Sequence, residues 1–331
     1  MKKLLYLLCV MTCTLLAGCA NKKVDPEIEV FSEVFEDSSI FEKDETKFSY
    51  GDLRGVEFCF SSGAGAWSTI MTIGEDGSFK GMYSDSDMGV TGEGYPDGTR
   101  YCCIFNGQLS ELIQIDELTY TAELLDISYE NEVGEEEYAD NVRYIYSDAY
   151  GLDDAETLYF YLPGTEREKL SEDCLSWVSQ AMYDDEYNPV DELDFVCIYN
   201  EGGKQGFYSY NMIDNFISNL SFYEEQEQSY FDELEKLMTQ MDMTINALNR
   251  FQLWDRALNE EWTILMDVLS ADEKEKLKAE EREWIIYKDN AVKEAGAEAE
   301  GGSLQPMLEY DMGAEITKAR VYELKEILLL H

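Results

Sequence analysis

Histidine is nearly missing from this sequence of 331 residues, because the single one, His331, is also the last residue. Catalytic systems that pair a serine or cysteine nucleophile with a histidine base need that base inside a shaped site. A terminal residue cannot supply it, so these systems are excluded. The sequence also has no CxxC pair, and with one histidine we expect no zinc site.

Other signatures of reactive sites are incomplete. Residues 63–66 lack the GxxxxGK pattern of a phosphate-binding loop. Residues 85–89 are similar to the start of a calcium loop, but Pro96 stands at the twelfth position, where an acidic residue is needed, so a solvated acidic loop is favoured. Carboxylates are too numerous for a catalytic pair to be picked out by counting. We predict a protein that is not an enzyme, with no catalytic residues, no metal and no cofactor.

Basic residues are scarce: 25 lysines and arginines stand against 70 aspartates and glutamates, for a net charge of −45. Such a chain repels nucleic acid and anionic headgroups, and both are excluded as direct partners. Residues 230–331 hold 23 acidic and 12 basic side chains, whereas residues 19–229 hold 47 and 11. This asymmetry predicts two domains. Plentiful aromatic residues predict that the chain is folded.

Only one long apolar run is present, at residues 4–16, and it is shorter than the roughly 20 residues that a membrane-spanning helix needs. Two lysines precede it and two small residues follow, which is the pattern of a signal peptide over residues 1–18. The ending Leu-Ala-Gly-Cys resembles a bacterial lipobox, which implies that Cys19 is acylated. We therefore expect a lipid anchor on the extracytoplasmic face of a bacterial membrane. A secretory signal with a chance cysteine is the alternative.

Five further cysteines remain in the mature part: Cys59, Cys102, Cys103, Cys174 and Cys197. An odd number cannot all pair within one molecule. Cys102 and Cys103 are adjacent on a predicted strand, so they point to opposite faces. We expect mostly buried free thiols, with one disulfide from Cys59 to Cys102 or Cys103 as the exception.

Residues 48–215 are predicted to be mainly β, after an acidic tether at residues 19–47. The turn residues Asp76-Gly77 separate two β-prone runs and predict a hairpin. Short strands with regular turns predict an antiparallel barrel or sandwich. Ser171 is the expected N-cap of one short helix. The β-prone runs are residues 56–60, 70–73, 78–83, 101–105, 118–127, 142–146, 158–162 and 195–199.

Residues 220–331 are predicted to form an all-α antiparallel bundle. Apolar residues at 254, 258, 262, 265 and 269 recur at helical spacing. Residues 270–273 form a capping box that starts the next helix. A helix near residues 224–249 precedes these two, and a last one reaches residue 330. The fold class is therefore α+β with two domains.

The helical region carries short motifs in a fixed order. They are Asp255 with Leu258-Asn259, Trp284-Ile285 with Tyr287-Lys288-Asp289, Gly301-Gly302-Ser303 with Pro306-Met307, and then Thr317, Arg320 and Leu324. This ordered set resembles the LprI-like lysozyme-inhibitor family, over residues 230–324. The resemblance implies an all-helical envelope domain, often found in lipoproteins or secreted proteins. Some members of the family are linked to inhibition of lysozyme.

The resemblance also implies three family cysteines, at places that here hold Ala247, Val292 and Met312. The bundle is then expected to rest on its apolar faces alone, without disulfide-braced loops.

The motif residues also have structural interpretations. Trp284 is predicted to be a core residue rather than a ligand contact. Asp289 and Arg320 are candidates for an ion pair between helices. Gly301 and Gly302 permit a tight turn, and Ser303 is the expected N-cap of the last helix.

Two functions follow. The first is binding, and inhibition, of lysozyme or a similar cationic envelope-active protein, since lysozymes are commonly basic and opposite charge speeds association. The alternative is an envelope structural or glycan-binding module. Trp67 is its candidate stacking residue, although a core position for Trp67 is favoured.

Overall fold

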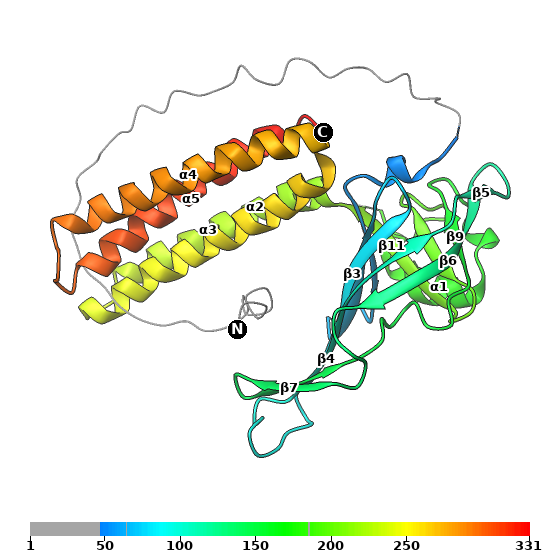
Figure 1. The fold of residues 1–331 in the computed structure, drawn as a ribbon, viewed down its shortest axis with the longest axis horizontal. Coiled ribbons are helices and arrows are strands. Elements are labelled where there is room, and N and C mark those ends of the chain that lie inside the picture. The colour runs from blue at the N-terminus through cyan, green and yellow to red at the C-terminus, as the bar shows by residue number, and fades with distance from the viewer. Residues whose placement is uncertain (1–46, 64, 185) are drawn as a thin grey trace. The chain divides into compact units, whose positions relative to one another are not determined.

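The structure is a computed structural model that describes residues 47–63, 65–184 and 186–331. The predicted signal peptide, Cys19 and all but the last residue of the tether lie outside the described residues. The described chain divides into two compact units, Phe48–Met212 and Ile213–His331, and Figure 1 shows the elements of each. Within the described ranges, no helix is both long and apolar enough to cross a membrane.

The first unit is a closed antiparallel β-barrel of eight strands. Each strand pairs with its neighbours in chain order, and the last strand pairs back to the first, which closes the ring. The prediction of a barrel or sandwich is confirmed as a barrel. Its strands are β1 (Val56–Ser61), β2 (Trp67–Ile73), β3 (Ser78–Asp87), β4 (Thr99–Leu109), β6 (Thr119–Tyr129), β9 (Thr157–Tyr161), β10 (Cys197–Asn200) and β11 (Gln205–Asn211).

Three further strands extend the barrel. β4 changes partner along its length: its second half pairs with β6, and its first half pairs in parallel with β8 (Val142–Tyr146). β8 forms an antiparallel pair with β7 (Glu136–Ala139), and β5 (Ile113–Gln114) lies at the edge of β6. The sequence patterns predicted β8 but missed β5, β7 and β11.

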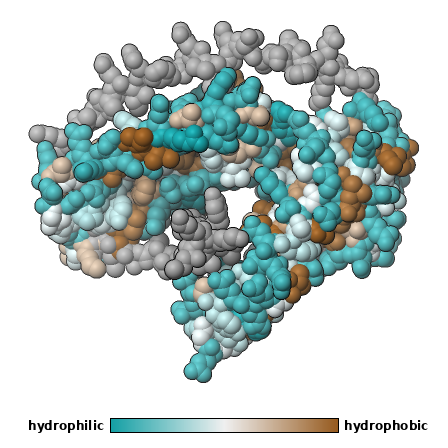
Figure 2. Space-filling model, in the orientation of Figure 1, coloured by the Kyte–Doolittle hydropathy of each residue, from teal (hydrophilic) through white to brown (hydrophobic). Residues whose placement is uncertain are grey.

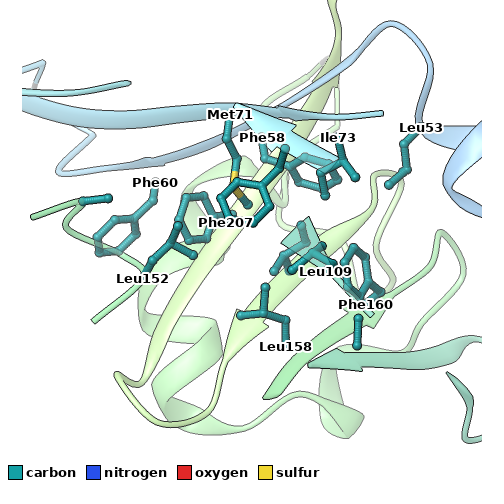
Figure 3. Packing of buried hydrophobic residues seen from close by; sticks show 14 of the residues in the cluster. Leu53, Phe58, Phe60, Met71, Ile73, Leu109, Leu152, Leu158, Phe160 and Phe207 are labelled. Carbon is teal, nitrogen blue, oxygen red and sulfur yellow. The ribbon is translucent and has the colours of Figure 1, made fainter. Parts of the chain in front are cut away.

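Aromatic side chains fill the barrel interior, as Figure 3 shows for Phe58, Phe60, Phe160 and Phe207, all of which are fully buried. An eight-stranded barrel is just wide enough for side chains to fill it. Gly81 of β3 leaves room for a further ring, that of Phe105: a Cβ at this position would overlap that ring and a backbone carbonyl of β2. The barrel is therefore a packed core.

The outer face of β10 is covered by the short helix α1 (Glu172–Val178). The Ser171 side chain caps this helix by accepting a hydrogen bond from the Cys174 amide, as predicted. Single 3-10 turns, η1 (Tyr50–Leu53), η2 (Arg167–Lys169) and η3 (Ser179–Ala181), complete the unit.

All five described thiols are free and buried, so the expected disulfide from Cys59 to Cys102 or Cys103 is wrong. Cys59 lies on β1, and the other two lie on β4, with β2 and β3 between them. The sequence pattern could not show how many strands separate these runs in the barrel.

The second unit is a bundle of four helices, α2 (Met212–Leu234), α3 (Gln240–Val268), α4 (Ala271–Ala297) and α5 (Gln305–Leu328). The capping box at Ser270 is confirmed: its hydroxyl accepts from the Glu273 amide, and the Glu273 carboxylate accepts from the Ser270 amide. The single helix expected near residues 224–249 is wrong: α2 ends at Leu234, and α3 begins at Gln240 with Thr239 as its N-cap. Ser303 does not cap α5, since that helix begins after Leu304.

The bundle core is centred on Trp254 of α3, which is fully buried. Its indole nitrogen donates a hydrogen bond of 2.8 Å to Glu227 of α2, and Lys318 of α5 donates to the same carboxylate at 2.6 Å. Phe216 and Leu220 of α2 are buried as well. Helix α2 is therefore an integral part of the bundle.

Candidate functional site: a groove between two helices

A groove with a volume of about 410 Å³ lies between α3 and α4. Its lining residues recur at intervals of three and four along each helix, so each helix contributes one face. From α3 these are Asp255, Leu258, Asn259 and Trp262, and from α4 they are Lys278, Glu281, Arg282, Trp284, Ile285 and Lys288.

The groove has a small excess of positive charge in a strongly acidic chain, since two of its lining residues, Asp255 and Glu281, are acidic. Three of its lining residues are cations: Lys278, Arg282 and Lys288. The Lys278 ammonium pairs with Glu275 at 2.9 Å. The Lys288 ammonium lies 4.9 Å from the centre of the Trp284 ring, a cation–π arrangement. Trp284 is thus half-buried at the side of the groove, and its ring contacts the Lys288 ammonium.

Arg320 of α5 is buried, with its guanidinium 5.8 Å from the centre of the Trp284 ring, and it contacts three carboxylates. It donates to Glu280 and Glu281 of α4 and to Glu323 of its own helix, at 2.8 to 3.0 Å. The expected pair between Arg320 and Asp289 is therefore wrong. Asp289 is exposed, about two helical turns farther along α4 than the carboxylates that Arg320 contacts.

Glu261 is the most unusual ionisable group of the bundle. The residue is 0% exposed, and neither carboxylate oxygen has a hydrogen-bond partner among the described residues. Burial raises the pKa of Glu261 to about 9, although the nearby Arg320 acts to lower it. Burial also raises the pKa of Glu281. At neutral pH the Glu261 side chain is therefore a neutral carboxylic acid.

Three consecutive residues of α4 are apolar and only partly covered by the bundle. Ile285, Ile286 and Tyr287 are 44%, 62% and 49% exposed, and only Leu277 and Gly296 of this helix are buried. Brown patches on the helical unit in Figure 2 show apolar side chains at its surface. Consecutive exposed apolar residues beside a groove are typical of an interaction surface.

The structure brings together only some of the predicted motif residues. Asp255, Leu258, Asn259 and Trp284 line the groove, whereas Tyr287 and Asp289 are exposed on α4, Gly301, Gly302 and Ser303 form the turn before α5, and Thr317 and Arg320 are buried. Gly301 has a φ of 72°, in the left-handed region that glycine favours. Lys288 was part of the predicted motif, whereas the sequence analysis missed Lys278, Arg282 and Glu261.

Trp67, the candidate glycan contact, belongs to an aromatic cluster in the barrel unit. Its ring lies 4.8 Å from Phe60 and from Tyr150, and 6.0 Å from Trp177. The residue is half-buried, so these contacts give it a packing role. In the described ranges, no group of histidine, cysteine and acidic residues could hold a metal ion.

Comparisons with known proteins concern the helical unit. Residues 232–324 match the family model described as Lysozyme inhibitor LprI. An uncharacterized protein of Rhizobium meliloti (strain 1021) is 34% identical over 109 residues, a match that covers 29% of this chain and 78% of that protein. No solved structure matches the chain. The matched range contains both helices that line the groove.

Proposed function

Because the chain belongs to the LprI lysozyme-inhibitor family through residues 232–324, we propose that it binds and inhibits a lysozyme or a similarly basic enzyme that attacks the cell envelope. The observation that carries the proposal is the uncovered apolar surface of α4 at Ile285, Ile286 and Tyr287, within the family range. A fold that needed these side chains only for packing would bury them.

Charge supports the encounter of the two proteins. The chain carries a net charge of −45, and a basic partner is drawn toward an acidic protein faster than a neutral one. The groove lining contains three cations and two acidic residues, so it attracts a basic partner little, and the exposed apolar residues of α4 are the better contact. Long-range attraction then comes from the rest of the acidic chain, and specificity comes from α4.

The sequence of the N-terminus supports a location at the membrane surface, where the two proteins would meet. A signal peptide followed by a lipidated Cys19 would hold the protein on the extracytoplasmic face of a bacterial membrane. Envelope-attacking enzymes act there. The tether at residues 19–47 would separate the folded units from the lipid.

An affinity comparison of two matched variants tests the surface. Ile286→Ala removes an exposed apolar side chain from α4, and Met241→Ala removes one from the start of α3, where Met241 is 64% exposed. Alanine favours helix, so both variants should fold. We expect Ile286→Ala to weaken binding of a basic lysozyme about tenfold, as truncation does at the minority of interface residues that carry the binding energy. Met241→Ala should leave the Kd unchanged.

Equal affinities for the two variants would contradict the assignment of the α4 surface. No binding by the unaltered protein would contradict the proposed function itself.

A further inference from the structure

Two buried cysteines meet beneath α1 in the barrel unit. Cys174 lies on α1 and Cys197 on β10, and their sulfur atoms are 3.6 Å apart. Both residues are 0% exposed. Around them is a small apolar cluster that includes Val178 and Met182, and it is distinct from the barrel interior.

The other three described cysteines are placed differently. Cys59 lies on β1, and β2 and β3 separate it from Cys102 and Cys103 on β4. Cys103 belongs to the barrel interior, and its neighbour Cys102 points to the opposite face of the strand. Of the five thiols, Cys174 and Cys197 are the pair that the fold brings together.

We propose that Cys174 and Cys197 are an oxidation site and form a disulfide that joins α1 to the outer face of β10. Forming the bond brings the two sulfurs from 3.6 Å to about 2.05 Å, an approach of about 1.5 Å. The bond closes a loop over residues 174–197, which contains α1 from Cys174 onward and the segment leading to β10, and it restricts the unfolded chain accordingly.

The oxidant is a disulfide, either small or protein-borne. One cysteine thiolate attacks a sulfur of that disulfide, and a thiol leaves as a mixed disulfide forms. The second cysteine thiolate then displaces the remaining thiol. Two protein thiols thereby lose two protons and two electrons, and the disulfide donor is reduced to two thiols.

The surroundings of the pair fix when this reaction takes place. The contact with Cys174 and burial both raise the pKa of the Cys197 thiol, and only a thiolate attacks a disulfide. Both sulfurs are also inaccessible in the folded unit. The bond therefore forms during folding, before α1 closes over β10, and the folded unit then shields it from reductants.

Refolding in a redox buffer tests the site. Residues 20–331 would be reduced in denaturant, refolded with a mixture of reduced and oxidised glutathione, alkylated in denaturant and mapped by peptide mass spectrometry. We expect a linked peptide pair containing Cys174 and Cys197, with Cys59, Cys102 and Cys103 alkylated. Alkylation of both Cys174 and Cys197, or a link from either one to another cysteine, would overturn the proposal.

Two variants serve as a matched pair for the same map. Cys174→Ala should leave Cys197 alkylated, whereas Cys103→Ala should retain the link at Cys174. Since the main result is obtained on the unaltered chain, it does not depend on how well either variant folds. Failure of this map would leave the lysozyme proposal untouched, because the pair lies outside the family range.

Discussion

The Glu261→Gln substitution should stabilise the helical unit at neutral pH. Burial raises the pKa of Glu261 to about 9, from 4.5 for a free glutamate. Between these two values the folded protein binds a proton that the unfolded chain has lost. Stability from this group is therefore fully present below about pH 4.5, and it is lost progressively as the pH rises toward about 9.

The size of the effect follows from the shift. Each unit of pKa corresponds to about 1.4 kcal/mol, so keeping this carboxyl protonated at pH 7 costs about 3 kcal/mol of the free energy of unfolding. Glutamine has a similar shape and does not titrate. It should remove this cost while leaving the packing between α3 and its neighbours unchanged.

Urea unfolding of the full chain, followed by circular dichroism in the helical region, measures the gain. The variant's free energy of unfolding should exceed that of the unaltered protein by a margin that grows by about 1.4 kcal/mol for each pH unit between about pH 5 and pH 8. Glu283→Gln, at an exposed position of α4, is the control and should show no such growth. A difference that stays constant with pH would refute the assignment of a protonated, buried Glu261.

Three other predictions concern the parts of the chain separately. Residues 213–331 should fold alone as a helical unit and melt at a higher temperature than residues 224–331, which lack the buried Phe216; a circular dichroism spectrum of residues 213–331 without helix would contradict this. Cys19→Ala should leave a full-length precursor that takes up no labelled fatty acid, and unchanged labelling would disprove the anchor. Gly81→Ala should destabilise the barrel by about 1–3 kcal/mol, because the added methyl overpacks the core; an unaltered denaturation midpoint would show that the barrel can yield there.

Local signals in the sequence predicted local structure well. The hairpin at Gly77 and the capping box at Ser270 each depend on a few neighbouring residues, and both are present in the structure. Barrel closure is different, since it pairs Val56 with Asn211, more than 150 residues along the chain. β11 was missed although Phe207, Tyr208 and Tyr210 favour a strand, and the choice between a closed barrel and a sandwich could not be made, because the pairing of β11 with β1 leaves no local signal.

The candidate site was predictable in part. Motif residues such as Asp255 and Trp284 were found because they stand in a fixed order, but their order does not say which of them meet in space. Glu261 was missed because one more glutamate carries no information in an acidic chain. Its spacing of three from Leu258 and four from Leu265 places it on the apolar face of α3, and this signal could have identified a buried acid.

Inhibition of a basic lysozyme by residues 20–331 at physiological salt tests the central proposal most directly. At about 0.15 M salt the Debye length is near 8 Å, so attraction between exposed charges is strongly screened while buried contacts persist. The proposal predicts that the protein keeps most of its low-salt inhibition under these conditions, whereas the acidic peptide of residues 20–47 does not inhibit. If the protein inhibits no better than that peptide at physiological salt, the function proposed from the family is contradicted for this chain.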